Sequence, residues 1–431
     1  MCERDQVLEH LNQEYSEPLR DPVWKNISLS QPLLKLIGLP VFQKLNRIKQ
    51  LGPTYLVYPG ATHTRLNHSL GVFHIARRMI THLLKKEEIA SCTLTGVKAF
   101  LCAALLHDLG HYPYAHSLKE LEIESHETLT AGRICEDDFS TIIKQDLGTD
   151  PLLIAAIIDP GFHYDGPEDV SFFRNLLSGV LDPDKLDYLN RDAYFCGIPY
   201  GIQDVDFILE EIIPHEIQGL AITQKGLTAV ESILFSKYLM YRAVYWHKTV
   251  RVATAMIKKA LLMGLAAGII QPHTLYWMDD QDFFSFTRSM DYPPFRMVGY
   301  VGRRRLYKNL YSVPFQPGNQ VQDGLLSLEK RLQFEEELAR EVRRLIGRNV
   351  SPEAIVIDIP EPISFEIDLP VYDPGEAKSV RFNESGSVFD RGVVEGFSRT
   401  LRCVSLICLR DEEIVNALER LGARRILEEG L

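Results

Sequence analysis

Apolar residues recur at helical spacing from about residue 32 to residue 268, with Pro and Gly as breaks. Side chains that recur every three to four residues cover one face of a helix, so this stretch predicts a helical body. The strongest patterns predict four helices, the last of them a single long one: Leu70–Lys85, Gly96–His107, Asp184–Phe195 and Thr228–Ala267.

The pattern changes after Trp277. Residues 278–324 mix Asp, Pro, Gly and Tyr with a basic cluster at Arg303–Arg305, and we expect irregular structure there. Leu325–Ile346 has the pattern of an amphipathic helix rich in Glu and Arg. Beyond it, short runs predict four strands and a final helix: Ala354–Ile359, Phe365–Val371, Ser379–Phe382, Ser387–Phe389 and Asp411–Glu429.

Composition narrows the class of protein. The 431 residues are 45% hydrophobic and 24% charged, which excludes a chain that is disordered throughout. The formal net charge is −11, so the average surface repels polyanions, and we expect neither a duplex nucleic acid nor a polybasic membrane contact as partner. A local basic pocket for a small anion remains compatible with this charge.

Three sequence features bear on the cellular compartment: apolar stretches, the N-terminal segment and the cysteines. The longest uncharged apolar stretch, about Ala260–Ile270, is far below the roughly 20 residues of a membrane span, and the N-terminus carries no apolar leader. The seven cysteines are odd in number and form no CxxC motif, which is typical of reduced thiols. We therefore expect a soluble, cytoplasmic protein without a membrane partner.

Three segments place metal-ligating side chains at helix ends. They supply two imidazoles, His68 and His107, and two carboxylates, Asp108 and either Asp182 or Asp184. Such a mixed nitrogen and oxygen set suits Fe, Mn, Co, Ni or Zn as a divalent ion, with Mg²⁺ as an ion that accompanies a substrate. The alternative for His107 is a histidine stabilised by the helix dipole, but this leaves the buried carboxylate beside it without a partner.

Two stripes of tyrosine and charge support a site. Four-residue spacing aligns side chains on one helix face, and it recurs in Asp184, Tyr188 and Asp192, and again in Lys237, Tyr241, Tyr245 and Lys248. Arg65 and Lys185 add further positive charge near the ligands. A metal among these cations would suit a polyphosphate, although each stripe alone could be a solvated helix face.

Histidines are dense after the His107–Asp108 pair, at His111, His116 and His126. Histidine titrates near neutral pH, so one of them could protonate a leaving oxygen. The alternative is a turn-stabilising role in a loop. We expect the other histidines, His63 among them, to be ordinary surface or core residues.

Four ordered segments resemble the HD-domain metal-dependent phosphohydrolases, more narrowly their dNTP triphosphohydrolase branch: residues 42–52, 58–72, 107–116 and 181–192. The resemblance implies a mainly α fold, with a helical HD-domain body over 1–290 and the HD core at about 50–200. The smaller α+β C-terminal part, 291–431, would serve oligomerisation or regulation. Family members assemble as dimers or tetramers, so a homo-oligomer is implied.

The resemblance also assigns roles. The metal ligands would be His68, His107, Asp108 and Asp184, and phosphates would be held by Arg65, Lys185, Lys237 and Lys248. Gln50, Tyr188 and Asp192 would contact the sugar, with Leu51 and Tyr245 at the 2′ position and Tyr241 beside them. His116 and His126 match the acid/base histidines, with His111 next to them.

The chain departs from the family pattern at several positions. Lys119 stands where a carboxylate usually follows the catalytic histidine, with Glu120 one place later, and Lys237 replaces an arginine. The animal enzyme of this branch reads the guanine of an activator nucleotide with an Asp and an Arg. The matching positions here are Gly38 and Asn46, so we do not expect an activator site of that kind.

The resulting hypothesis is a metal-dependent hydrolase that cleaves a dNTP into deoxynucleoside and triphosphate. Two alternatives remain: an HD-family nucleotidase or phosphodiesterase for another phosphate ester, and a nucleotide-sensing regulatory protein without turnover.

Overall fold

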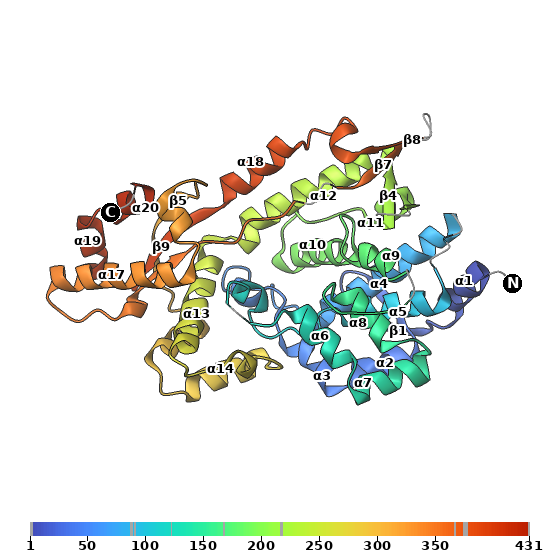
Figure 1. The fold of residues 1–431 in the computed structure, drawn as a ribbon, viewed down its shortest axis with the longest axis horizontal. Helices are drawn as coiled ribbons and strands as arrows, with labels where there is room; N and C mark the ends of the chain where they lie inside the picture. The colour runs from blue at the N-terminus through green and yellow to red at the C-terminus, as the bar shows by residue number, and fades with distance from the viewer. Residues whose placement is uncertain are drawn as a thin grey trace.

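The computed structural model describes residues 3–86, 89, 92–121, 123–166, 169–215, 219–365, 368–373 and 378–429. A helical body, blue to green in Figure 1, is followed by a smaller part in which helices accompany short strands. The predicted mainly α fold with a smaller α+β C-terminal part is confirmed. No described helix is long and apolar enough to cross a membrane.

The body surrounds two buried helices, α4 (Arg65–Lys86) and α5 (Leu94–Leu106). Helix α10 (Pro183–Cys196) packs against α4. The hairpin β1 (Glu17–Asp21) and β2 (Lys25–Leu29) precedes them. The remaining helices of the body are α1 (Glu3–Gln13), α2 (Gln31–Gly38), α3 (Pro40–Gln43), α6 (His126–Ile134), α7 (Asp137–Ile142), α8 (Pro151–Ile158), α9 (Asp169–Leu177) and α11 (Val205–Glu211).

The single long helix predicted over Thr228–Ala267 is wrong. The chain forms α12 (Leu227–Met240), a π-helical turn at Tyr241–Tyr245, and then α13 (Lys248–Ala266). The helix ends because His247 adopts an extended ψ of 134° and its side chain accepts a hydrogen bond from the Thr249 amide. Helix α13 turns away from α12 at this point (Figure 1).

Residues 278–324 are also more regular than predicted. They form α14 (Asp280–Ser289), α15 (Arg296–Gly302), β5 (Lys308–Pro314) and α16 (Gln320–Gly324). A reciprocal capping box between Asp279 and Asp282 starts α14, a signal that the mixed composition obscured.

Two small sheets organise the rest of the chain. One has the strand order β5-β9-β6, all antiparallel, with β9 (Cys403–Cys408) in the centre beside β6 (Ile355–Asp358). The helices around it are α17 (Leu328–Ile346), α19 (Glu412–Arg420) and α20 (Ala423–Glu429). The final helix was predicted as one element, but Gly422 separates its two halves with a φ of +66°.

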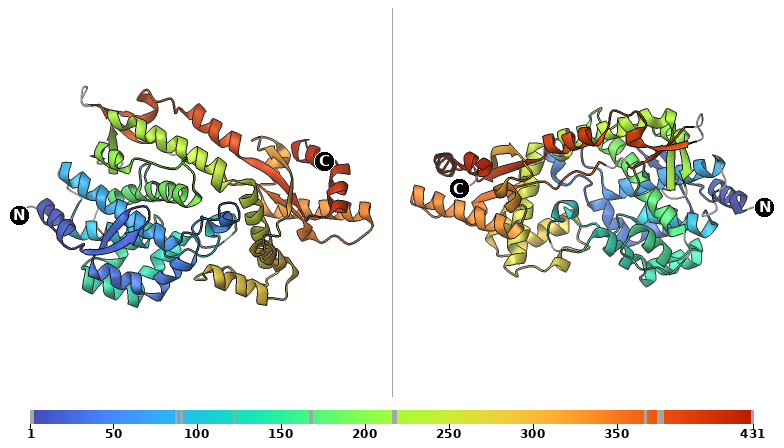
Figure 2. Two further views of the ribbon diagram at one scale, coloured as in Figure 1. Left: turned by 180° about the vertical axis from the view of Figure 1, so that it is seen from behind. Right: turned by 45° about the horizontal axis from the view of Figure 1, so that its top comes forward.

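The second sheet has the order β3-β4-β7-β8: β3 (Ile212–His215), β4 (Gly219–Thr223), β7 (Pro370–Asp373) and β8 (Lys378–Arg381). It joins the body to the C-terminal part, and α18 (Arg391–Leu401) runs beside α12 (Figure 2). The strand predicted at Ser387–Phe389 is a loop instead. Of the predicted strand Phe365–Val371 only Pro370 and Val371 lie in β7, while residues 366 and 367 lie outside the described residues.

Candidate functional site

The site lies where α4 begins, α5 ends and α10 begins. Helix α10 starts at Pro183 because Asp182 caps it and accepts a hydrogen bond from the Lys185 amide at 2.7 Å. Helices α4 and α10 approach closely at Gly71, where an added Cβ would lie 1.8 Å from Asp187 Oδ1. The chain therefore needs glycine here to bring the two helices together.

Three of the four predicted metal ligands form one cluster: ligand atoms of His68, His107 and Asp184 all lie within 4.8 Å of one another. Asp184 Oδ1 lies 2.8 Å from His68 Nε2 and 3.9 Å from His107 Nε2. Asp108 Oδ1 lies 3.4 Å from His107 Nε2, and its Oδ2 lies 4.0 Å from His68 Nε2. The structure therefore brings together all four side chains.

The charges and hydrogen bonds of this cluster fit a divalent cation. His107 donates through Nδ1 to the Ala104 carbonyl at 2.9 Å, but its buried Nε2 has no hydrogen-bond partner among the described residues. Burial alone would lower the pKa of His68, but hydrogen bonds to Asp184 and Asp187 outweigh it and raise the pKa to about 10. The cluster thus attracts positive charge, and its imidazole and carboxylate donors suit a borderline metal.

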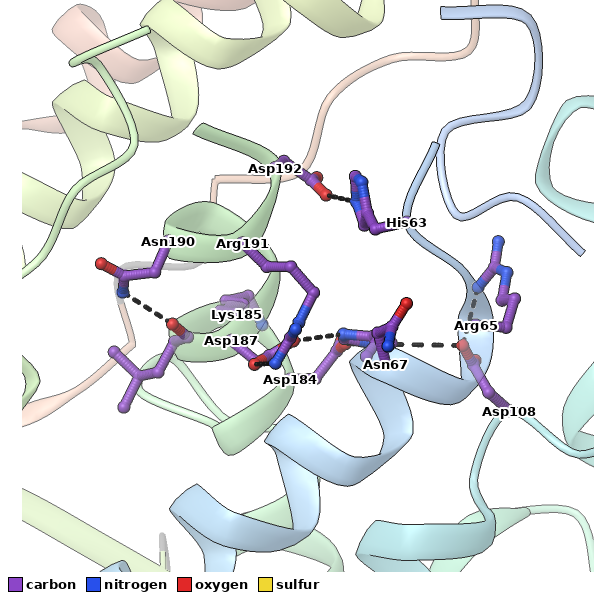
Figure 3. A network of polar contacts seen from close by, with 12 residues as sticks. His63, Arg65, Asn67, Asp108, Asp184, Lys185, Asp187, Asn190, Arg191 and Asp192 are labelled. Atoms are coloured by element: carbon purple, nitrogen blue, oxygen red, sulfur yellow. Dashed lines mark hydrogen bonds and ion pairs between the residues drawn. The ribbon is translucent and has the colours of Figure 1, made fainter. Parts of the chain in front are cut away.

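A carboxylate that the sequence analysis did not select orients His68. Asp187, fully buried, accepts hydrogen bonds from His68 Nδ1 at 2.9 Å and from Trp24. It also accepts hydrogen bonds from Arg191, which lies beside it in Figure 3. Burial would raise the pKa of Asp187, but Arg191 and His68 lower it to about 2. Asp187 therefore fixes the ring so that Nε2 faces the cluster. Its place one helical turn after Asp184 is the sequence signal that could have revealed it.

Arg65 contacts the cluster from the side opposite α10 (Figure 3). Its guanidinium donates through Nη1 to Asp108 Oδ2 at 2.8 Å, while Nε is buried without a partner among the described residues. Burial would raise the pKa of Asp108, but His111 and Arg65 lower it well below its ordinary value. Asp108 is therefore held as a carboxylate.

The three histidines predicted as acid/base groups meet beside Asp108. The ring centroids of His111 and His126 are 3.7 Å apart, and His111 Nε2 lies 3.1 Å from His116 Nε2. Burial is the largest cause that lowers the pKa of His126, to about 4. Their nitrogens lie close enough together to hold a metal as well, so the geometry alone leaves two chemical roles open.

Glu120 does not replace the carboxylate that the family pattern places three residues after His116. Its side chain turns away and binds Lys258 and Arg331, each at 2.8 Å. Lys119 is exposed.

A second polar group surrounds Asp192 on α10, two turns beyond Asp184. Asp192 accepts a hydrogen bond from Tyr245 Oη at 2.8 Å, and His63 Nε2 lies 2.8 Å from its other oxygen. The backbone N–H of Gln50 donates to the backbone carbonyl of His63 at 3.0 Å. The buried side-chain oxygen of Gln50, Oε1, has no hydrogen-bond partner among the described residues. His63, expected to be an ordinary residue, therefore links Gln50 to Asp192.

The remaining predicted residues differ in their surroundings. Lys185 Nζ donates to Asp182 at 2.6 Å, and Lys237 Nζ donates to the Ser364 carbonyl at 2.6 Å. Lys248 is exposed at the start of α13. The ring of Tyr245 lies near those of Tyr188 and Tyr241, with ring centroids 6.3 and 5.1 Å away. Leu51 directly follows Gln50 and is half-buried. The phosphate and sugar roles of these residues stay predictions.

Comparisons with known proteins agree with this geometry. A family model described as "HD domain" matches residues 65–158, and one described as "HD associated region" matches residues 204–384. A protein of Methanocaldococcus jannaschii with no assigned function is 35% identical over 338 residues, which cover 75% of this chain and 67% of that protein. The deoxynucleoside triphosphate triphosphohydrolase SAMHD1 of Homo sapiens is 29% identical over 290 residues, 60% of this chain and 46% of that enzyme.

A solved structure has the same fold over nearly its whole length. A hypothetical protein from Aquifex aeolicus aligns with a TM-score of 0.71 at 26% identity, over 93% of this chain and 99% of that one. The chain spans only about half the length of several other curated relatives, including one from Bacillus subtilis.

Proposed function

The chain belongs to the HD-domain phosphohydrolase superfamily, in the branch that includes the deoxynucleoside triphosphate triphosphohydrolases, and from this premise we propose that it hydrolyses dNTPs to deoxynucleoside and triphosphate. Its metal-dependent phosphohydrolase chemistry follows from the family. The choice of a dNTP as substrate is the proposal.

One observation carries this choice: α10 bears both the metal-ligand candidate Asp184 and the anchored carboxylate Asp192. Asp192 follows Asp184 by eight positions on this helix, a rise of about 12 Å. Asp192 is held by His63 and Tyr245, so its position is fixed before any ligand arrives. A phosphohydrolase for a simple ester does not require a fixed hydrogen-bonding carboxylate at this distance from its metal, whereas a nucleotide sugar offers a hydroxyl to it.

His68, His107, Asp108 and Asp184 would hold the divalent metal. When bound, the metal would polarise the phosphoryl group and lower the pKa of water. Asp187 orients His68 for this task, and Arg65 holds Asp108 in place. Lys248 offers an exposed ammonium for phosphate oxygens.

The proton for the leaving 5′ oxygen would come from the group of His111, His116 and His126. Because burial lowers the pKa of His126 to about 4, this imidazole is neutral at pH 7 without substrate. The negative charge of a bound triphosphate favours the protonated form, so substrate binding itself would load the proton that the reaction consumes.

At the sugar, Leu51 and Tyr245 would crowd the 2′ position. We therefore expect kcat/KM for dATP to exceed that for ATP by at least tenfold, because a 2′ hydroxyl would have to displace packed side chains. Comparable values for the two nucleotides would contradict the proposed substrate class.

The decisive experiment incubates purified protein and Mn²⁺ with each dNTP and, separately, with nitrophenyl phosphate esters. Released inorganic triphosphate supports the proposal, whereas turnover of esters alone, or dNTP binding without turnover, contradicts it. Asp184→Ala should abolish turnover, and Asp206→Asn, on the exposed face of α11, should retain it and so exclude a contaminating hydrolase.

A further inference from the structure

Lys44 is a buried lysine that the proposed chemistry does not use. It begins the helical turn Lys44–Arg47, directly after α3, and is 4% exposed. Its ammonium forms no ion pair with the residues that the structure describes, because Asp279, the nearby carboxylate, binds Arg47. Burial outweighs the attraction of Asp279 and lowers the pKa of Lys44 to about 7. A buried ammonium without a counter-ion is costly, so other neighbours have to replace the water that it loses.

Backbone carbonyls of one loop bind this ammonium. Lys44 Nζ donates to the carbonyl oxygen of His111 at 2.7 Å and to that of Leu109 at 3.4 Å. Both carbonyls belong to the histidine loop, residues 109–118, which directly follows Asp108 and carries His111 and His116. A charged donor binds a carbonyl more strongly than a neutral one, so this lysine is a strong anchor for the loop.

The residue between the two carbonyls is held by a different element. The Gly110 amide donates to Thr130 Oγ1 of α6 at 2.8 Å, and an added Cβ at Gly110 would lie 2.3 Å from the His126 carbonyl. Helix α6 therefore fixes Gly110, while Lys44 binds the residues on either side of it. Three consecutive residues of the loop are anchored in this way.

Trp277 lies over the ammonium of Lys44, with its ring centroid 4.8 Å from Nζ. Trp277 has a φ of +65°, a left-handed conformation that is unfavourable for a bulky residue. The indole is exposed and thus lies between the buried charge and the solvent, in the geometry of a cation–π contact. The fold keeps a strained backbone at the position that covers this lysine.

We propose that Lys44 is a positioning residue that holds the histidine loop in the geometry for proton transfer. Its two hydrogen bonds fix the backbone from which the His111 ring projects. The rings of His116 and His126 lie against that of His111, with centroids 4.7 and 3.7 Å away, so the three rings depend on the same anchor. This inference rests on the proposed role of these histidines in protonating the leaving oxygen.

Lys44→Met tests the anchor, because methionine keeps an apolar chain of similar length and loses the donors. On the substrate that the parent chain hydrolyses, kcat should fall at least tenfold and KM should change less than threefold, since the loop carries proton donors. Metal content should equal that of the parent. Amide hydrogen exchange over residues 109–118 should become at least tenfold faster. Lys44→Arg keeps the charge and the donors, so both readouts should lie between those of Lys44→Met and the parent.

The matched control is Lys259→Met. Lys259 is also 4% exposed, but its ammonium binds Glu335 of α17 instead of the loop. This variant should lower the melting temperature and leave kcat and the exchange of residues 109–118 as in the parent.

Trp277→Asn weakens the same anchor from the surface. Asparagine tolerates the left-handed conformation, so the melting temperature should stay within a few degrees of the parent's. Water would then reach the ammonium and compete for it, and kcat should fall at least threefold. A role in stability alone would not lower kcat in a chain that is equally stable.

Parental exchange of residues 109–118 in Lys44→Met would overturn the proposal, as would faster exchange with a parental kcat or an equal loss of kcat in Lys259→Met. If Lys44→Met does not fold, parental kcat and exchange in Trp277→Asn would overturn it. A parent chain without turnover would contradict the proposed function instead, and the exchange measurements would then decide by themselves whether Lys44 holds the loop.

Discussion

A buried polar atom without a hydrogen-bond partner costs about 1–3 kcal/mol, and His107 Nε2, in the candidate metal cluster, has no such partner among the residues that the structure describes. His107→Ala should therefore remove one ligand and lower the bound metal to less than a tenth of one ion per chain. Elemental analysis of the purified variant measures this directly, with the exposed His163→Ala as control. Full metal content in His107→Ala would remove this histidine from the ligand set.

Asp187 would act on a bound metal through His68, whose Nδ1 it holds at 2.9 Å. Asp187→Asn keeps the size of the side chain but loses the charge that holds His68, Trp24 and Arg191. We expect metal affinity to fall about 10- to 100-fold, as is typical when the hydrogen-bond partner of a ligating histidine is altered. Competition with a chelator measures the affinity, and Asp137→Asn, at an exposed position of α7, should leave it unchanged.

Side chains differ in how far sequence alone could locate them. His68, His107 and Asp108 stand in short motifs at helix ends, so the sequence alone could suggest them as metal ligands. The family pattern then selected Asp184 over Asp182. His63 stands in no such motif, and the helical spacing of Asp187 from Asp184 is the one signal that it offers, because each of the two acts by holding another residue. The contact of Asp187 with His68 depends on the packing of α4 against α10 at Gly71, which the sequence pattern does not show.

At the scale of elements, Glu120 joins three segments that are far apart in sequence. It follows the histidine loop, and its carboxylate binds Lys258 of α13 and Arg331 of α17. Glu120→Gln should destabilise the protein by about 3 kcal/mol at pH 7, because it leaves two partly buried cations without their counter-charge. Urea unfolding measures the difference, and Glu336→Gln, exposed on α17, is the control.

The same contact predicts a pH dependence. Burial would raise the pKa of Glu120, but Lys258 and Arg331 lower it below the ordinary value of 4.5. A lowered carboxyl pKa stabilises the fold above pH 4.5, and this contribution is lost as the pH falls through the folded-state pKa. The stability difference between wild type and Glu120→Gln should therefore shrink below pH 4.5, and a constant difference down to pH 3 would contradict the ion triad.

Helices with a strong apolar period were predictable, and their interruptions were not. The break between α12 and α13 depends on a π-helical turn and on the His247 cap, neither of which alters the apolar pattern. Strand β9 lies at the centre of its sheet and is buried along most of its length, so it has no alternation of polar and apolar residues to recognise.

At the scale of the molecule, the C-terminal part shares a core with the body. Val356 of β6 and Ile407 of β9 belong to the same buried cluster as Met256 of α13 and Phe295. Ion pairs follow the same route, as between Arg251 and Asp358 at 2.6 Å. The domain boundary predicted near residue 290 passes through this cluster, and its place stays a prediction.

A chain truncated after residue 290 should therefore fold poorly, because α13 would expose the apolar face that β6 and β9 cover. We expect a melting temperature at least 10 °C below that of the full chain, or aggregation on purification, as measured by thermal denaturation and size-exclusion chromatography. A truncated chain as stable as the full one would show that the shared core contributes little.

The break at Trp246 and His247 has a mechanical consequence. Tyr245 precedes it and is tied to α10 through Asp192, whereas Lys248 follows it on α13, which Arg251 ties to the C-terminal part. Tyr245 and Lys248 therefore lie on the two helical segments that meet at Trp246 and His247. The spacing between the tyrosine and the lysine therefore depends on the backbone conformation of Trp246 and His247, where α12 and its π-helical turn give way to α13.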